Sequence, residues 1–188
     1  MAIRISVDLD NTVFNMAEKY RAVIESFHEK YVPPVSYDVY KNGYSVAVAD
    51  ALHELLNSDQ IYKTRVFDNR IPKVLNSIYN NPKYDLFYVT ERLIKNHLDT
   101  LGQLEHSDII CEDNHLVHRI PKLDALKEYE IQLCFDDAPH VVSDCLENNI
   151  DVVMISNPDT AYNHHLCEHV EHYPDLMTAL IKRGIIME

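Results

Sequence analysis

The chain has 188 residues, of which 46% are hydrophobic and 25% charged, which is the composition of a soluble globular protein with one domain, or one domain with an insertion. The formal net charge of −13 argues against a nucleic acid or an anionic membrane as the main partner, although a small phosphorylated substrate stays compatible with a bound divalent cation. The sequence has no apolar stretch of roughly 20 residues and no basic-then-apolar signal pattern, so we predict a cytoplasmic protein.

The first predicted element is a buried strand over residues 3–9 that ends in carboxylates. Ile3, Ile5 and Val7 suit a strand covered on both faces, and Asp8 and Asp10 follow at its end. Ligands bind at this carboxyl end of the strands in an open α/β sheet. Turns also favour Asp and Asn, so this motif taken alone fits an ordinary exit turn equally well.

Helical sequence follows before the next strand. Apolar spacing predicts an amphipathic helix over residues 14–31, which two prolines end, and a second helix over residues 46–56. About fifty residues are far more than a simple crossover between parallel strands needs. We therefore predict an inserted, all-helical cap at residues 15–68 and a core made of residues 1–14 and 69–188.

Strands and helices alternate after the insertion. The predicted strands cover residues 84–89, 108–111, 131–135 and 151–156. The predicted helices begin at Ile71 and cover 93–104, 122–129, 141–148 and 176–183. This alternation predicts a parallel sheet with helices on both faces.

Polar residues end three of these strands, where a buried strand has no packing use for them. They are Asp8, Thr90 and Asp136, and a parallel sheet brings all three to the same edge. The whole set resembles the haloacid dehalogenase (HAD) superfamily in order and in placement at strand ends. The motifs that carry the resemblance are Asp8-x-Asp10-x-Thr12, Thr90, Lys122 and Asp136-Asp137.

The resemblance covers nearly the whole chain and implies a three-layer, Rossmann-like α/β fold with a C1-type cap. It implies a phosphomonoester hydrolase, since the dehalogenases lack an acid at the position of Asp10. In this family Asp8 would attack phosphorus and form an aspartyl-phosphate, while Asp10 would act as general acid and base. Thr90 and Lys122 complete the implied catalytic set.

The resemblance also implies binding residues. A Mg²⁺ ion would be held by Asp8, the backbone carbonyl of Asp10, Asp136 and Asp137, relieving the repulsion among these carboxylates. The implied substrate-binding residues are Leu9, Thr12, Thr90, Glu91 and Lys122. Lys127 is a second candidate for the phosphate-binding lysine, but Lys122 is favoured because it opens a helix whose N-terminus would face the site.

Within the superfamily the chain looks like the 5'(3')-deoxyribonucleotidase (5'-nucleotidase C) family, which has a short chain, a helical cap and a Tyr-Asn element like Tyr162-Asn163. Two motifs depart from that family, namely Thr90-Glu91-Arg92 and the Ala138-Pro139 pair that follows the acids. The likeness to this family predicts a (deoxy)nucleoside monophosphate as the substrate. Because of the two departures, a sugar phosphate or phosphoglycolate is the alternative. A non-catalytic protein that binds a metal or a partner is a third alternative, and both monomer and homodimer remain open.

The sequence allows two interpretations for several side chains near the predicted site. Arg92 either contacts substrate or forms a surface salt bridge. The aromatic residues Phe14, Tyr37, Tyr40 and Tyr44 either stack on a base or pack in the core.

A cluster of histidines lies near the C-terminus. On a helix, His165, His169 and His172 would share one face, a spacing that suits a zinc site. A solvated, His-rich loop explains the same residues together with His164 and Cys167. The sequence fits both interpretations.

Overall fold

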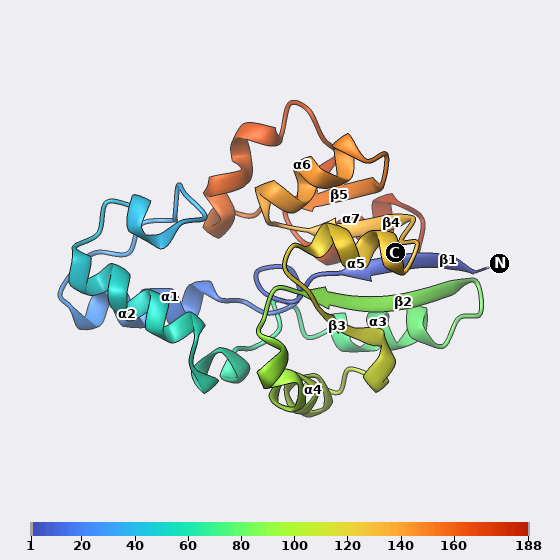
Figure 1. The fold of residues 1–188 in the computed structure, drawn as a ribbon, viewed down its shortest axis with the longest axis horizontal. Coiled ribbons are helices and arrows are strands. Elements are labelled where there is room, and N and C mark those ends of the chain that lie inside the picture. Colours follow the sequence, from blue (N-terminus) through green and yellow to red (C-terminus); the bar gives the residue numbers. More distant parts are fainter. Residues whose placement is uncertain (1, 188) are drawn as a thin grey trace.

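Six parallel strands form one sheet in the computed structural model, which describes residues 2–187 (Figure 1). Their spatial order is β3-β2-β1-β4-β5-β6, which places β1 between β2 and β4. The strands are β1 (Ile3–Val7), β2 (Tyr84–Thr90), β3 (Leu116–His118), β4 (Leu133–Asp136), β5 (Asp151–Ile155) and β6 (His172–Tyr173). The predicted α/β class with a parallel sheet is confirmed.

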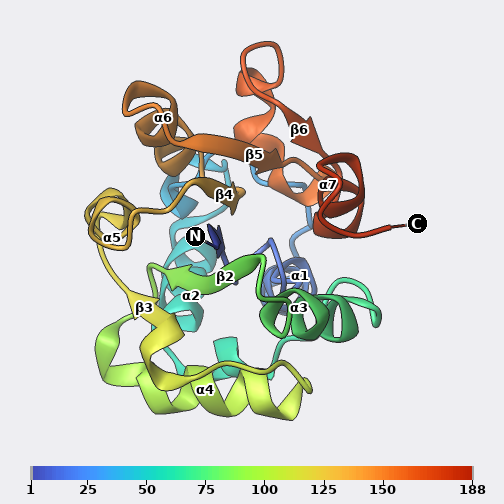
Figure 2. The same cartoon turned by 90° about the vertical axis from the view of Figure 1, so that its right-hand side faces the viewer.

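Helices cover both faces of this sheet (Figure 2). One face carries α3 (Ile71–Tyr79), α4 (His97–His106) and α7 (Leu176–Lys182), and the other carries α5 (Lys122–Glu128) and α6 (Pro139–Glu147). Alternation along the strands supplies both cores, because Val7 and Phe135 face the first group while Phe87 and Cys134 face the second. Within residues 2–187, no helix combines the length and apolarity needed to cross a bilayer.

A helical segment lies beyond the carboxyl ends of the strands (Figure 1, left). It contains α1 (Ala17–Ser26), η1 (Val39–Lys41), α2 (Val46–Leu56) and η2 (Asp59–Lys63). Ile24, Val48 and Leu52 form a small core of its own. The chain leaves and returns side by side, since the amide of Asn15 donates to the carbonyl of Arg65 over 2.8 Å. The two chain connections between this segment and the sheet are therefore hydrogen-bonded to each other.

The predicted helix over residues 14–31 is too long at both ends. Phe14 forms a bridge with Val66 instead of helical bonds. At the other end, His28 adopts a φ of 61°, and the amide of Glu29 returns to the carbonyl of Ile24. A left-handed residue of this kind ends a helix by satisfying its last carbonyls. The second predicted helix agrees with α2.

The predicted strand at residues 108–111 is wrong. Asp108 has a φ of 57°, and the amide of Ile109 bonds to the carbonyl of Leu104, so this stretch ends α4. The amide of Ile110 donates to the side chain of Asn76 over 2.7 Å and is not available to a neighbouring strand. Strand β3 forms later, and the two-residue β6 was not predicted because it is too short to show a period.

Candidate active site

Lys122 joins two carboxylates at the carboxyl edge of the sheet. Asp8 follows β1 directly, Asp136 ends β4, and Lys122 is the first residue of α5. The Lys122 Nζ lies 2.5 Å from Asp8 Oδ1 and 2.8 Å from Asp136 Oδ2. All three side chains are buried, and buried charges persist only when they are paired. The fold therefore fixes a charged group of defined geometry where the sequence predicted one.

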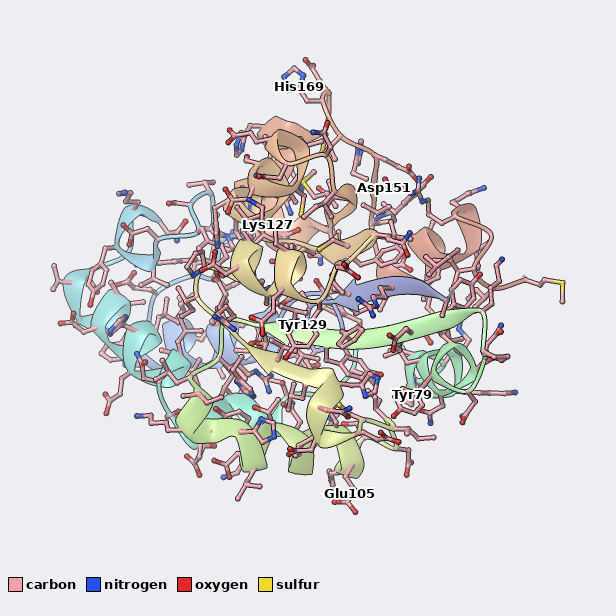
Figure 3. The ribbon with its side chains drawn as sticks, turned by 45° about the vertical axis from the view of Figure 1, so that its right-hand side comes forward. Tyr79, Glu105, Lys127, Tyr129, Asp151 and His169 are labelled. Atoms are coloured by element: carbon pink, nitrogen blue, oxygen red, sulfur yellow. The ribbon has the colours of Figure 1, made fainter. Side chains whose placement is uncertain are left out.

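The second candidate lysine lies elsewhere. Lys127 is exposed on the same helix, on the outside of the molecule (Figure 3). Only Lys122 of these two is placed to meet a phosphate next to Asp8.

Asp137 is held from two directions by hydroxyl groups. Tyr162, in η5 (Pro158–Leu166), donates its phenol to Asp137 Oδ2, and Thr12 donates to Oδ1 over 3.4 Å. The neighbouring Asn163 donates to the backbone carbonyls of Asp137, over 2.7 Å, and of Ile155. The Tyr162-Asn163 pair thus orients Asp137 and ties it to β5.

The three acids form a compact group. Ligand oxygens of Asp8, Asp136 and Asp137 all lie within 4.8 Å of one another, and no other such acid, His or Cys group occurs in residues 2–187. Burial, followed by the charge of Asp136, raises the pKa of Asp137 to about 7. Burial also raises the pKa of Asp8 well above its usual value, although the Lys122 charge works against this. The excess of buried negative charge fits a hard divalent cation with oxygen ligands.

Asp10 does not join this group, because Arg92 holds it. The Arg92 Nη2 lies 2.7 Å from Asp10 Oδ1, and Nε lies 2.9 Å from Oδ2, which makes a bidentate pair. The Arg92 side chain is only 2% exposed and lies over the rings of Phe14 and Tyr62. The interpretation of Arg92 as a surface salt bridge is therefore wrong, since burial makes this pair a structural part of the site.

Arg92 also connects Asp10 to the helical segment. Its Nη1 donates to Gln103 Oε1 over 2.7 Å, and Gln103 donates in turn to Thr64 Oγ1 over 2.9 Å. Thr64 lies where the chain returns to the sheet. No sequence pattern marks Gln103 or Thr64 as part of the site, because their contacts depend on α4 packing beside the segment that returns to the sheet.

A cavity of about 320 Å³ opens over these groups. The sheet side of its wall includes Asp8, Asp10, Thr90, Glu91, Arg92, Lys122, Asp137 and Tyr162. The helical segment contributes Tyr20, Tyr37, His53, Leu56, Asn57 and Ile61. A larger hollow of about 540 Å³ near Thr64 and Gln103 is not lined by Asp8, Asp10 or Asp137, so the chemistry points to the smaller cavity.

Two predicted substrate-binding side chains do not reach the cavity. Leu9 is fully buried in the core, its backbone carbonyl accepts hydrogen bonds from the amides of Val13 and Phe14, and Thr12 bonds to Asp137. Among the aromatic candidates, Phe14 packs in the core, whereas Tyr37 lines the cavity. Tyr20 also lines it and was missed, because its position on α1 looked like ordinary helix packing.

The aromatic residues Tyr40 and Tyr44 lie outside the cavity wall. Tyr40 donates to Asp50, and Tyr44 donates to the carbonyl of Val32. Both therefore serve the internal structure of the helical segment.

The C-terminal histidines do not share a helix. His165 lies in the 3-10 helix η5, His169 lies in a loop at the outer edge of the molecule, and His172 lies in β6 (Figure 3). The helical zinc-site interpretation therefore lacks its geometric basis, which leaves the loop interpretation.

The chain resembles known proteins in structure and not in sequence. No protein-family model and no curated protein matches the chain in sequence. Among solved structures, a HAD family hydrolase from Deinococcus radiodurans R1, with bound phosphate and sodium, superposes with a TM-score of 0.63 at 10% identity. That match covers 99% of this chain and 98% of the other. The fold is that of the HAD-like hydrolases.

Two further structures share this fold over their full lengths. A hydrolase from Pseudomonas syringae gives a TM-score of 0.61 at 14% identity and covers 100% of both chains. A protein described as a predicted phosphatase from Clostridium acetobutylicum gives 0.57 at 16% identity, covering 98% of this chain and 99% of its own. The HAD-like fold therefore includes the helical segment as well as the sheet.

Proposed function

We propose that the chain is a phosphomonoester hydrolase that works through an aspartyl-phosphate. The observation that carries this proposal is the Asp8–Lys122 contact at the carboxyl edge of the sheet, beside Thr90 and the acidic pair. A phosphate ester needs a nucleophile in line with phosphorus and positive charge around the equatorial oxygens. Asp8 is the nucleophile in this proposal, and Lys122 together with the Thr90 hydroxyl binds the phosphoryl oxygens.

Proton transfer is assigned to Asp10. Its carboxylate lines the cavity two residues after the nucleophile and is 25% exposed, so it can meet the leaving oxygen. Protonated Asp10 gives its proton to the leaving oxygen as Asp8 displaces that oxygen from phosphorus, and the resulting Asp10 carboxylate later removes a proton from the water that attacks the aspartyl-phosphate. Arg92 fixes the direction of this carboxylate.

A magnesium site is part of the proposal. Asp8, Asp136 and Asp137, with the backbone carbonyl of Asp10, would hold Mg²⁺, and the buried acids fit a hard cation in charge and in ligand type. Bound there, the metal supplies positive charge that neutralises the phosphate and the acids together. Tyr162 and Thr12 keep Asp137 in place for this role.

Metal binding is expected to depend on pH. Without metal, the raised pKa values of Asp8 and Asp137 mean that the native state binds protons that the unfolded state releases, so this stabilisation is lost as pH rises through about 7. Saturating Mg²⁺ should therefore raise the Tm more at about pH 8 than at about pH 6. The expected rise at about pH 8 is roughly 5–10 °C.

Thermal unfolding with and without Mg²⁺ checks this expectation, with EDTA-treated protein as the reference. Asp137→Asn should lose most of the Mg²⁺ effect, whereas Asp113→Asn, at an exposed position, should keep it. An equal Mg²⁺ shift at both pH values would contradict the assignment of the site.

The proposed substrate is a (deoxy)nucleoside monophosphate. We propose that the helical segment is the predicted cap, residues 15–68, and that it selects the leaving group. It places Tyr20 and Tyr37 on the cavity wall, and aromatic rings of this kind can stack on a base. A sugar phosphate is the second candidate, because the cavity is small and partly polar.

A hydrolysis screen tests the proposal. With Mg²⁺ present, deoxynucleoside monophosphates should be cleaved with a higher kcat/KM than sugar phosphates or phosphoglycolate. If they rank no higher than the sugar phosphates, the nucleotidase assignment fails and the phosphatase assignment stands. If no phosphate monoester is cleaved, a non-catalytic binding protein on this fold replaces both.

A further inference from the structure

Glu91 places an ionised carboxylate on the cavity wall, next to Thr90. Its Oε1 lies 2.9 Å from His140 Nε2, and its Oε2 accepts a long hydrogen bond of 3.4 Å from the phenol of Tyr37. Burial works to raise the pKa of Glu91, but the His140 hydrogen bond and the charge of Lys122 outweigh it, and the pKa is lowered. The carboxylate is therefore charged at neutral pH.

The hydrogen-bond partner of Glu91, His140, lies outside the cavity wall. His140 belongs to α6 and is not part of the cavity wall, whereas Glu91 is. A carboxylate offers about four lone-pair positions, and the two contacts above use only two. Glu91 thus keeps both its charge and free acceptor positions toward the cavity.

The cations on the cavity wall are already engaged. Lys122 bridges Asp8 and Asp136, and Arg92 is paired with Asp10. Lys122 is the one placed to meet the phosphate, next to the proposed metal. In the described residues, no further Lys or Arg lines the cavity to meet charge on the rest of the substrate.

Among the described residues, the cap side of the cavity contributes no lysine or arginine to balance the charge of Glu91. Its residues are tyrosines, apolar side chains, Asn57 and His53, and His53 lies against the ring of Tyr40. Asn57 and the tyrosine hydroxyls suit a neutral polar group. An anionic group in this space would face Glu91 directly, because His140, the partner of Glu91, lies outside the cavity wall.

We propose that Glu91 sets the charge selectivity of the site, so that the leaving group is neutral or cationic and donates a hydroxyl or amine to Glu91. Esters whose leaving group carries a carboxylate or a second phosphate are rejected. This inference rests on the proposed phosphatase activity and narrows its substrate. It favours nucleoside and polyol leaving groups over glycolate.

A matched pair of esters isolates the effect of charge. 2-Hydroxyethyl phosphate and 2-phosphoglycolate share a two-carbon leaving group and differ in a hydroxymethyl against a carboxylate. The wild-type kcat/KM should favour the neutral ester by at least about tenfold, as expected for one like charge in a partly solvated site. Glu91→Gln should lower this ratio about tenfold, and Glu91→Asp, which keeps the charge, should retain most of it.

The ratio cancels changes in phosphoryl transfer, which both esters share. Glu147→Gln removes the same charge from the exposed far end of α6 and should leave the ratio unchanged. A wild-type preference for phosphoglycolate, or an unchanged ratio in Glu91→Gln, overturns the inference while the phosphatase assignment stands. The wild-type ratio decides alone if Glu91→Gln fails to fold. Failure to hydrolyse these esters and p-nitrophenyl phosphate overturns the proposed function together with the inference.

Discussion

Asp8→Asn is expected to abolish phosphate ester hydrolysis, lowering kcat by roughly 10⁴-fold or more, as loss of a covalent nucleophile does elsewhere. The amide keeps the shape of the side chain but cannot attack phosphorus. Because burial raises the pKa of Asp8, removing this charge should not destabilise the metal-free protein. Turnover of p-nitrophenyl phosphate with Mg²⁺, together with the Tm, measures both effects.

The control for this variant is Asp124→Asn, at an exposed position of α5 two residues after Lys122. It removes the same charge outside the cavity and should change kcat by less than about twofold. If Asp8→Asn kept a tenth or more of the activity while folded, the nucleophile would have to be another group. A covalent phosphate on Asp8, trapped by acid quenching, gives independent support.

The sheet edge was predictable because it follows from local pattern. Asp8, Thr90 and Asp136 each end a strongly apolar strand, and parallel pairing brings such ends together whatever the lengths of the connections. The structure places Asp8 and Asp136 on the same Lys122 ammonium. Their chemical roles stay predictions until hydrolysis is measured.

Contacts between distant segments were not predictable in the same way. The partner of Arg92 is Asp10, 82 residues earlier, and no period or spacing in the sequence connects them. The false strand at residues 108–111 has the same cause. Its apolar residues fit a strand, but the side chain of Asn76 takes the amide of Ile110. Tertiary hydrogen bonds thus decided both cases against local propensity.

The Asp10–Arg92 pair gives the second large effect. Asp10→Asn should lower kcat for alkyl phosphates by about a thousandfold, within the range of general acid–base catalysis, because an alkoxide leaves poorly without a proton. The loss should be smaller for p-nitrophenyl phosphate, whose leaving group needs no proton. Arg92→Met keeps an apolar chain over Phe14 but frees Asp10. It should reproduce the same dependence on the leaving group.

Arg92→Met should also unfold at a lower temperature. Losing one partner of a buried ion pair costs about 3–5 kcal/mol, and the partial exposure of Asp10 reduces this to about 2–3 kcal/mol. For a chain of this length the Tm should fall by roughly 5–10 °C. Arg70→Met, which breaks an exposed pair with Asp68, is the matched control and should shift the Tm little.

A double-mutant cycle decides whether Arg92 acts through Asp10. If Arg92 positions the carboxylate, the double variant Asp10→Asn/Arg92→Met should be little slower on alkyl phosphates than Asp10→Asn alone. The reason is that Asp10→Asn already removes the proton transfer that Arg92 supports. Fully additive losses would mean that Arg92 acts on the substrate directly. The hydrogen-bonded series Asp10–Arg92–Gln103–Thr64 would then be a structural link between the sheet and the helical segment, with no part in proton transfer.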